Sequence, residues 1–347
     1  MTEYLLKERE KAILRFIIHQ FILTANPVGS RNISKKYDIG LSPASIRNIM
    51  ADLEELGYLD HPHTSAGRVP TDRGYRFYVD SLMDPPNLGN EFKSMVNVNL
   101  SQTPSETEDL LKITSTMLSN LTNQLALVSY PKFEQAVLER IQIVRLSSVR
   151  ILVVVTVQSG LIRTITLEID AEVNENNIST VQLFLNERLS GLKFSDIRST
   201  LSERMKDFNS DLLRPIIRVF IDSVDKIFTD ISSEKTIISG AKNILTQPEF
   251  ENHEQFQSVI ELIENKDVII HILEKKISDD VDLNIIIGKE NEDEKFSDYS
   301  VITKEYKVGD LKGTLGIMGP KRMDYSKIIA AVVYIAEQLT RELTKQR

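Results

Sequence analysis

The segment LSPASIRNIMADLEELGYLDHPHTSAGRVPTDRGYR, residues 41–76, decides how the N-terminal part of this chain folds. Ser42 and Pro43 form a typical helix start, because a serine side chain caps free backbone N–H groups and proline has no N–H to lose at the first helical position. Apolar residues then recur at helical spacing until Gly57 ends the pattern. An alternating strand, a polar loop of small residues (61–68) and a further helix are expected to follow.

Two more helices are expected before this segment. Residues 5–23 carry an apolar stripe on one helical face, NPVGS at 26–30 interrupts it, and a short helix then ends at Gly40. The predicted order is therefore helix, helix, tight turn, helix, strand, loop, helix. This is the layout of a winged helix-turn-helix, in which one α-helix enters the roughly 12 Å wide major groove of DNA and a β-hairpin forms the wing beside it.

The helix that begins at Ser42 has side chains suited to DNA. Its first turn carries small residues that allow close approach, and Arg47 and Asn48 point away from the apolar stripe. Arginine can donate two hydrogen bonds to guanine, and asparagine can pair in a similar way with adenine. The alternative is an ordinary helical subdomain in which both side chains are merely solvated. The agreement of turn, cap, polarity and wing favours DNA.

Phosphate contacts are expected mainly from outside this helix. Hydroxyl groups, backbone N–H groups and arginines in the polar loop and at the start of the second helix suit DNA phosphates. Arg68 could instead enter the minor groove. Arg73 and Arg76 either extend the phosphate contacts or form salt bridges within the domain. The predicted DNA-binding residues are Ser30, Arg31, Ser42, Pro43, Ala44, Ser45, Arg47, Asn48, His63, Thr64, Ser65, Gly67, Arg68, Arg73 and Arg76.

The histidines of the polar loop do not predict a metal site. His61 and His63 have the spacing of paired ligands, but the chain holds five histidines and no cysteine, and no third and fourth ligand accompanies them. No GxxxxGKS/T phosphate loop, HExxH pair, GxGxxG after a strand or catalytic Ser/His/Asp arrangement is present. We therefore expect no metal, no cofactor and no enzymatic activity.

The charge of the chain is unevenly distributed. The formal net charge is -8, which by itself argues against nucleic acid. Residues 1–83, however, carry 11 Lys and Arg against 10 Asp and Glu, whereas the remainder carries 31 against 40. A locally basic module on an acidic protein suits a binder that touches DNA with one part only. The absence of cysteine, of a membrane-spanning stretch and of a signal-peptide pattern predicts a cytoplasmic protein.

The rest of the chain predicts an α+β multidomain protein. The expected elements are an amphipathic helix at 106–128, a three-strand meander at 139–169, a helical block at 171–238, three strands between 283 and 320, and a closing helix from near Asp324. A sheet split by a helical block indicates one domain inserted into another. The expected domains are 1–83 for DNA binding, a linker at 84–103, an α+β domain formed by 104–170 with 240–347, and a mainly helical insertion at 171–239.

Several stretches together resemble one protein family over the whole length of the chain. SPASIRNIMADLEELGYLDHPHTSAGRVPTDRGYRFYVDSL (42–82) is the most specific, and 29–34, 240–250, 287–291 and 316–339 support it. They resemble HrcA, the bacterial heat-inducible transcription repressor family. The resemblance implies a winged-helix domain, a GAF-like domain and an inserted dimerisation domain. It also implies a homodimer that represses heat-shock (chaperone) genes at an inverted-repeat operator, with activity modulated by the GroEL chaperonin and lost on heat shock.

Two alternatives remain beside this interpretation. The chain could be a ligand-sensing enzyme or signalling protein that uses its winged helix for protein contacts; the salt dependence of DNA binding separates the two. A second question concerns GIMGPKRMDYSK (316–327), where Lys321 and Arg322 lie between a strand and a helix. This segment either binds an anion near the helix start or is a plain strand-to-helix corner, and the corner is favoured because a Gly-rich consensus is missing.

Overall fold

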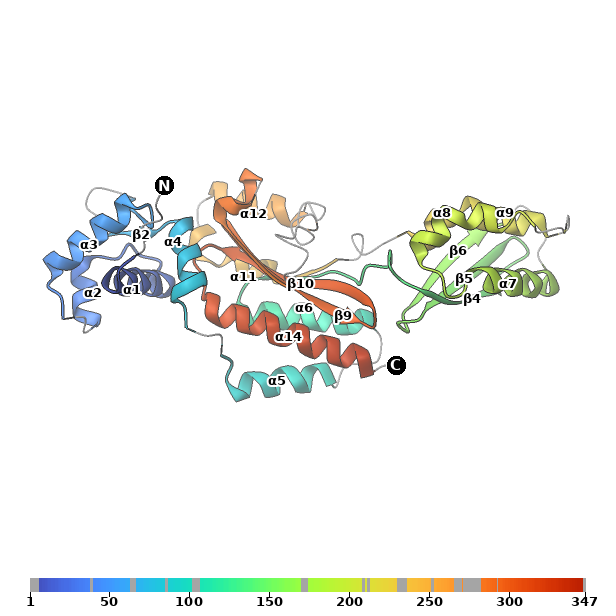
Figure 1. The fold of residues 1–347 in the computed structure, drawn as a ribbon, viewed down its shortest axis with the longest axis horizontal. Helices are drawn as coiled ribbons and strands as arrows, with labels where there is room; N and C mark the ends of the chain where they lie inside the picture. The colour runs from blue at the N-terminus through green and yellow to red at the C-terminus, as the bar shows by residue number, and fades with distance from the viewer. Residues whose placement is uncertain are drawn as a thin grey trace.

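The computed structural model describes residues 6–37, 40–62, 67–84, 87–101, 107–169, 174–207, 210, 213–229, 236–250, 253–264, 270, 282–291 and 293–345. These residues form helices and sheets in three units: an N-terminal unit (6–84), a central unit (87–128 with 236–345) and an inserted unit (133–229). In Figure 1 the N-terminal and inserted units lie at opposite ends of an elongated molecule. No helix in these ranges is long and apolar enough to cross a bilayer.

The N-terminal unit is built of short helices and one hairpin around an apolar core. Ile13, Leu14 and Ile17 of the first helix and Ile46 and Leu53 of the third are fully buried, as their helical spacing predicts. Ser42 caps the third helix as expected, since its side chain accepts a hydrogen bond from Ser45 N. The elements are α1 (Glu8–Thr24), α2 (Ser30–Lys36), α3 (Pro43–Glu55), β1 (Leu59–Asp60), β2 (Val69–Pro70) and α4 (Asp72–Phe77), which continues as a π-helical turn (Tyr78–Leu82).

The central unit is a five-stranded antiparallel sheet covered on both faces. The strand order is β7-β3-β10-β9-β8. Ala126 and Val128 of β3 pack in the core shared with α6 and α14, whereas Leu125 and Leu127 pack on the opposite face with α11 and α12, because successive side chains of a strand point to opposite faces. The elements are α5 (Asn90–Ser101), α6 (Thr107–Thr122), β3 (Leu125–Val128), β7 (Ile237–Ser239), α11 (Ala241–Leu245), the 3-10 turn Pro248–Phe250, α12 (His253–Glu264), β8 (Leu283–Ile287), the 3-10 turns Gly288–Glu290 and Glu294–Phe296, β9 (Tyr299–Val308), β10 (Leu311–Pro320) and α14 (Tyr325–Lys345).

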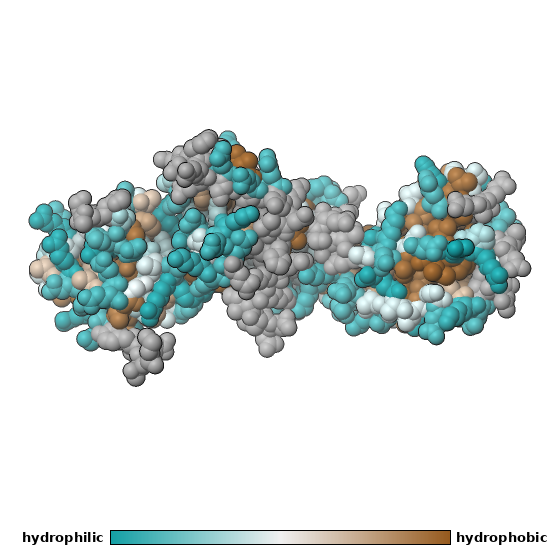
Figure 2. All heavy atoms as spheres, turned by 90° about the horizontal axis from the view of Figure 1, so that it is seen from above, coloured by the Kyte–Doolittle hydropathy of each residue, from teal (hydrophilic) through white to brown (hydrophobic). Residues whose placement is uncertain are grey.

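The inserted unit has a sheet and a core of its own. Its three strands form an antiparallel sheet in the order β4-β5-β6, separate from the central sheet. One face, which carries Ile141, Val153 and Ile165, packs against the helices of this unit. Figure 2 shows apolar side chains gathered on the face of this unit that is turned to the viewer. The elements are β4 (Leu138–Arg145), β5 (Arg150–Val157), β6 (Ile162–Glu168), α7 (Glu175–Leu189), α8 (Phe194–Arg204), α9 (Arg214–Asp222) and α10 (Val224–Phe228).

Three expectations about the organisation differ from the structure. The meander at 139–169 does not share a sheet with the later strands, so the insertion begins well before residue 171 and contains this three-stranded sheet beside the helices of the predicted helical block. Residues 90–101, expected within a linker, form α5, whose Val96 and Leu100 are buried. The predicted helix at 106–128 ends at Thr122 and is followed by β3. In each case the deciding contact is with residues far along the chain, which local spacing does not reveal.

The N-terminal unit is bound to the central unit through α4 and α1. Arg76 donates to both carboxylate oxygens of Glu290 and to the backbone oxygen of Ile285. The hydrogen bond to Glu290 raises the pKa of Arg76 further above its already high value. Asp72 accepts from Lys289 N at 2.9 Å, and Arg322 donates to Ile22 O at 2.7 Å. One hydrophobic core runs through both units, so their relative position is fixed by packing as well as by charge.

Removal of the Asn186 side chain is expected to open the edge of the inserted sheet. Its amide accepts from Ile141 N and donates to Ile141 O, both at 2.8 Å. Asn186→Ala leaves two backbone groups without these partners, at a cost of about 1–3 kcal/mol. Hydrogen–deuterium exchange of peptides covering β4 should accelerate by roughly tenfold or more. Asn176→Ala, at an exposed position of the same helix, is the control; equal exchange in both variants would contradict this role of Asn186.

Candidate nucleic-acid interface

Helix α3 presents one polar and one apolar face. Ile46, Met50 and Leu53 are buried, whereas Arg47 and Asn48 are exposed together with the residues of the first turn. Pro43 occupies the first helical position, and Ser45 N donates to Ser42 Oγ at 3.1 Å. The start of the helix is therefore fixed by its cap while its polar side chains remain open to solvent.

A concave surface of about 640 Å³ lies beside this polar face. It is formed by three segments: the start of α2, the exposed face of α3 and the base of the hairpin between β1 and β2. The structure thus brings together eight of the predicted residues, and it places Ser42 and Ser45 in the exposed first turn of α3 beside them. The lining residues are Gly29, Ser30, Arg31, Pro43, Ala44, Arg47, Asn48, Met50, Gly67 and Arg68.

The hairpin is held against the start of α2 by backbone hydrogen bonds. Val28 N donates to Arg68 O and Arg68 N donates to Val28 O, each at 2.9 Å. A Cβ atom at Gly67 would lie 2.4 Å from the backbone of Val28, so the close approach requires glycine at this position. Farther along, Leu59 pairs with Pro70 and Asp60 with Val69. The hairpin is therefore a fixed wall of the concave surface.

The cations on this surface differ in their neighbours. Arg31 and Arg47 are exposed, and neither has an ion-pair partner within the described ranges. Arg68, in contrast, forms an ion pair with Glu54 of α3, with 2.7 Å between Nε and the carboxylate. This Nε–H does not point at an acceptor, so the contact is Coulombic without a hydrogen bond. The same carboxylate lies 3.6 Å from His61 Nδ1.

Two predicted arginines lie away from the concave surface. The Arg73 guanidinium donates to Leu56 O at 2.9 Å and stacks on the Tyr58 ring at 4.7 Å. A cation at this position stabilises the C-terminal end of α3, where the helix dipole is negative. Arg76 forms a salt bridge with Glu290 of the central unit. Of the two predicted roles of Arg76, a phosphate contact or a salt bridge, the structure shows the salt bridge. Both side chains hold α3 and α4 in place.

The outcome for the remaining predicted residues is mixed. His63, Thr64 and Ser65 lie outside the described residues. Gly29 and Met50 line the surface but were not predicted. A signal was available for both, because Gly29 directly precedes Ser30 and Met50 lies three residues, about one helical turn, after Arg47.

Comparison with known proteins identifies the family. The model of the HrcA protein C terminal domain matches residues 108–329. The heat-inducible transcription repressor HrcA of Chlorobium phaeobacteroides (strain BS1) is 40% identical, over 98% of this chain and 99% of its own length. That of Prosthecochloris aestuarii (strain DSM 271 / SK 413) is 38% identical, over 96% and 97%. A crystal structure of a hypothetical protein shares the fold, with a TM-score of 0.60, 22% identity and coverage of 99% and 100%. The chain therefore belongs to the HrcA family of heat-inducible transcription repressors.

Proposed function

We propose that this protein is a DNA-binding repressor of heat-shock (chaperone) genes, not an enzyme, and that it binds an inverted-repeat operator as a homodimer. The observation that carries the proposal is the concave surface, which gathers the exposed face of α3, the start of α2 and the hairpin base. Its lining of arginine, serine, asparagine and small residues suits a DNA backbone and groove edge. The N-terminal unit is on this proposal a winged helix-turn-helix, and the hairpin is its wing.

In this arrangement α3 lies in the major groove. Arg47 and Asn48 project from its exposed face and would contact base edges, since both side chains can form paired hydrogen bonds with purines. Ser30 and Arg31 lie at the N-terminus of α2, where free N–H groups and a cation favour a phosphate. The loop residues His63, Thr64 and Ser65 would continue these contacts along the backbone of the DNA.

Arg68 has a double task in this proposal. Glu54 lies on α3 near the surface, and an unpaired carboxylate there would repel phosphate groups. The ion pair with Arg68 at 2.7 Å neutralises that carboxylate. The guanidinium has further N–H groups besides Nε–H, and these can donate to a phosphate or in the minor groove while the ion pair stays in place. Arg73 and Arg76 act as positioning residues in this scheme.

The two other units would supply regulation and dimerisation. We assign a GAF-like character to the central unit, on the basis of its antiparallel sheet between helical layers. The inserted unit is our candidate for dimerisation, because most of the large exposed apolar side chains of the described residues belong to it: Val144, Leu146, Val149, Ile162 and Leu183. On the uncovered face of its sheet, Val144, Leu152 and Thr166 form one cross-strand row and Val154 lies in the next.

Substitution of Arg47 should weaken and broaden DNA recognition. Operator sequences selected from random DNA should show two half-sites whose centres lie a whole number of helical turns, roughly 34–36 Å each, apart. Arg47→Ala should cost about 1–3 kcal/mol and relax the preference at one base position of each half-site. Arg341→Ala, an exposed arginine of α14, removes the same charge and should leave binding unchanged.

The measurement is a gel-shift or anisotropy series repeated at several salt concentrations. A DNA-binding function predicts that the logarithm of the association constant falls linearly with log salt, with a slope of about -0.9 per phosphate contacted. A flat salt response would exclude the proposed DNA-binding function. If Arg47→Ala and Arg341→Ala behave alike on the selected site, the assignment of base contacts to α3 is wrong.

A charge on the uncovered sheet face should dissociate the dimer. Val144 and Val98 are matched, with exposed fractions of 48% and 47%, but Val98 lies on α5 of the central unit. Val144→Asp should give a monomer in light scattering and lower the operator affinity, because a carboxylate cannot be buried without a partner. Val98→Asp should remain dimeric. A dimeric Val144→Asp protein would place the interface elsewhere.

The link to GroEL rests on family resemblance and on the exposed apolar residues of the inserted unit. We expect that a heated and cooled sample loses operator-binding activity and that GroEL with ATP restores it, since chaperonins bind apolar surface of incompletely folded chains. The active fraction is measured by titration with operator DNA before and after the cycle. Full activity after the cycle without chaperonin would argue against this mechanism.

A further inference from the structure

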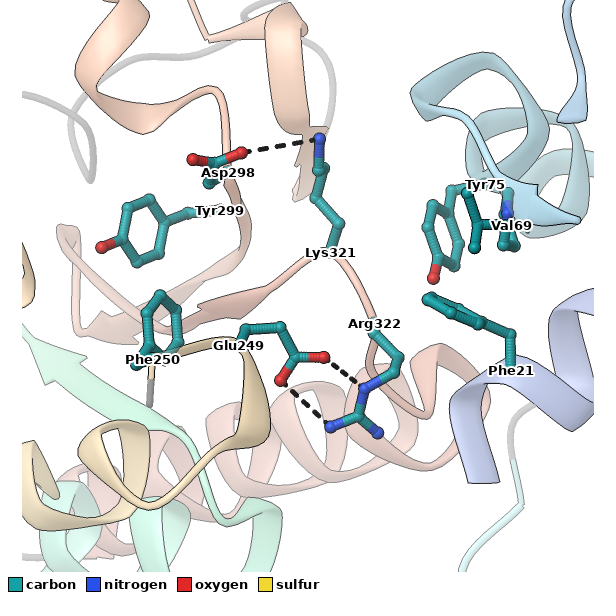
Figure 3. Close-up of a pocket in the computed structure, with 10 residues that line it drawn as sticks. Phe21, Val69, Tyr75, Glu249, Phe250, Asp298, Tyr299, Lys321 and Arg322 are labelled. Carbon is teal, nitrogen blue, oxygen red and sulfur yellow. Dashed lines mark hydrogen bonds and ion pairs between the residues drawn. The ribbon is translucent and has the colours of Figure 1, made fainter. Parts of the chain in front are cut away.

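A second pocket lies where the N-terminal and central units meet. Its volume is about 370 Å³, within the range of roughly 300–1,000 Å³ typical of small-molecule sites. Figure 3 shows side chains from both units pointing toward it. The N-terminal unit contributes Phe21, Val69, Pro70 and Tyr75, and the central unit contributes Glu249, Phe250, Asp298, Tyr299, Lys321 and Arg322. The strand-to-helix corner at Lys321 and Arg322 thus forms part of the pocket wall.

Aromatic rings form two opposite sides of this pocket. Phe250 and Tyr299 are stacked, with 5.5 Å between ring centroids and an interplanar angle of 13°. Tyr75 and Phe21 lie across from them, with the side chains of Lys321 and Arg322 in between (Figure 3). Aromatic walls favour a flat ring, which gains offset or edge contacts with them. The shape of the pocket therefore selects an aromatic body.

The charged groups of the pocket form one closed pair and one open pair. Glu249 and Arg322 are joined by two contacts, and Arg322 also donates to Ile22 O. Lys321 Nζ lies 2.9 Å from the carboxylate of Asp72 in the N-terminal unit and 3.9 Å from that of Asp298, which is too far for a hydrogen bond. The ammonium is therefore held by Asp72 and open toward Asp298, whose side chain is 72% exposed. A ligand end that enters between Lys321 and Asp298 meets one charge of each sign, so the complementary end carries both signs.

A buried hydroxyl is a second, independent sign of a ligand. Tyr75 is 2% exposed, and its hydroxyl has no hydrogen-bond partner among the described residues. Burial raises the pKa of Tyr75 well above its ordinary value, so the hydroxyl stays protonated and can donate. In Figure 3 it lies at the edge of the pocket near Phe21 and Arg322. Buried hydroxyl groups normally have partners, and a polar ligand atom would supply one.

We propose that this pocket binds a small aromatic zwitterion of the class of the aromatic amino acids. The ring lies between the Phe250–Tyr299 stack and the rings of Tyr75 and Phe21. The carboxylate of the ligand contacts Lys321 and its ammonium contacts Asp298. The ligand inserts between these two side chains and replaces their 3.9 Å contact with two charge-assisted hydrogen bonds.

Such a ligand would touch both units at once. A molecule that binds one relative arrangement of two units more tightly than another shifts the population toward that arrangement. The bound ligand therefore holds the N-terminal unit in its present position on the central unit. The consequence for DNA, which rests on the proposed repressor function, is a change in operator affinity when the pocket is filled.

The absence of tryptophan from the chain gives a direct test with L-tryptophan as the probe. Emission excited at a wavelength that tyrosine does not absorb then comes from the ligand alone. We expect saturable binding with higher anisotropy of the indole emission. Tryptamine, which lacks the carboxylate, and indole-3-propionate, which lacks the ammonium, should each bind about tenfold or more weakly. L-phenylalanine should compete with the probe.

Variants of the open pair complete the test. Asp298→Asn and Lys321→Gln should each weaken L-tryptophan about tenfold. Asp298→Asn is the decisive variant, because it changes an exposed side chain, whereas Lys321→Gln also removes the ion pair with Asp72 between the units. Asp310→Asn, at the exposed turn between β9 and β10, is the control with the same charge change. The proposal is overturned if no aromatic amino acid binds saturably, if the two analogues bind as well as L-tryptophan, or if Asp298→Asn binds like the control.

The effect on DNA is measured separately. Ligand binding is assayed without DNA, so it stands or fails independently of the repressor function. Operator affinity is then compared with and without saturating L-tryptophan, and a shift that Asp298→Asn abolishes is expected. A protein that binds the ligand but no operator contradicts the proposed function alone. Unchanged operator affinity with a filled pocket overturns the regulatory role of the site.

Discussion

The two hydrogen bonds between Val28 and Arg68 are the contact on which the candidate interface depends. They join the segment before α2 to the base of the hairpin, and Gly67 allows the backbones to approach so closely. Without them the two walls of the concave surface would belong to separate loops. The surface is thus defined by backbone pairing, which satisfies donors and acceptors of both segments, and only then by the side chains that it displays.

The contacts between the N-terminal and central units fix the position of the concave surface relative to the rest of the chain. Helix α4 follows directly after β2, and its Asp72 and Arg76 bind the turn at Gly288–Glu290. A Cβ atom at Gly288 would overlap the Asp72 carboxylate, so this contact is closely fitted. The arginine side chains that face this junction therefore orient the N-terminal unit on the central unit. This explains why arginines of similar spacing in the sequence divide between the concave surface and the central unit.

Local signals predicted much of the candidate site. Ser42 and Pro43 fixed the start of α3, and the strands of the meander followed from alternation and turns, because cap, turn and period act over a few residues. The partner of Arg76 could not be foreseen, since Glu290 lies 214 positions away. The short strand β3 was not predicted for a related reason. All four residues of Leu125–Val128 are buried, so apolar and polar residues do not alternate, and only the neighbouring strands of the sheet identify it.

The small number of unpaired cations on the concave surface gives a reason for the proposed repressor to be dimeric. Of the cations that line the surface, Arg31 and Arg47 have no ion-pair partner in the described ranges, while Arg68 is neutralised by Glu54. Each uncompensated cation adds one counterion-release step to binding, so one unit alone gains little affinity on any DNA. Two units joined through the inserted segment make the second contact intramolecular, which multiplies affinity only where both half-sites are present. On the proposed function, sparse charge on each unit thus turns dimerisation into a requirement for operator recognition and suppresses binding to unrelated DNA.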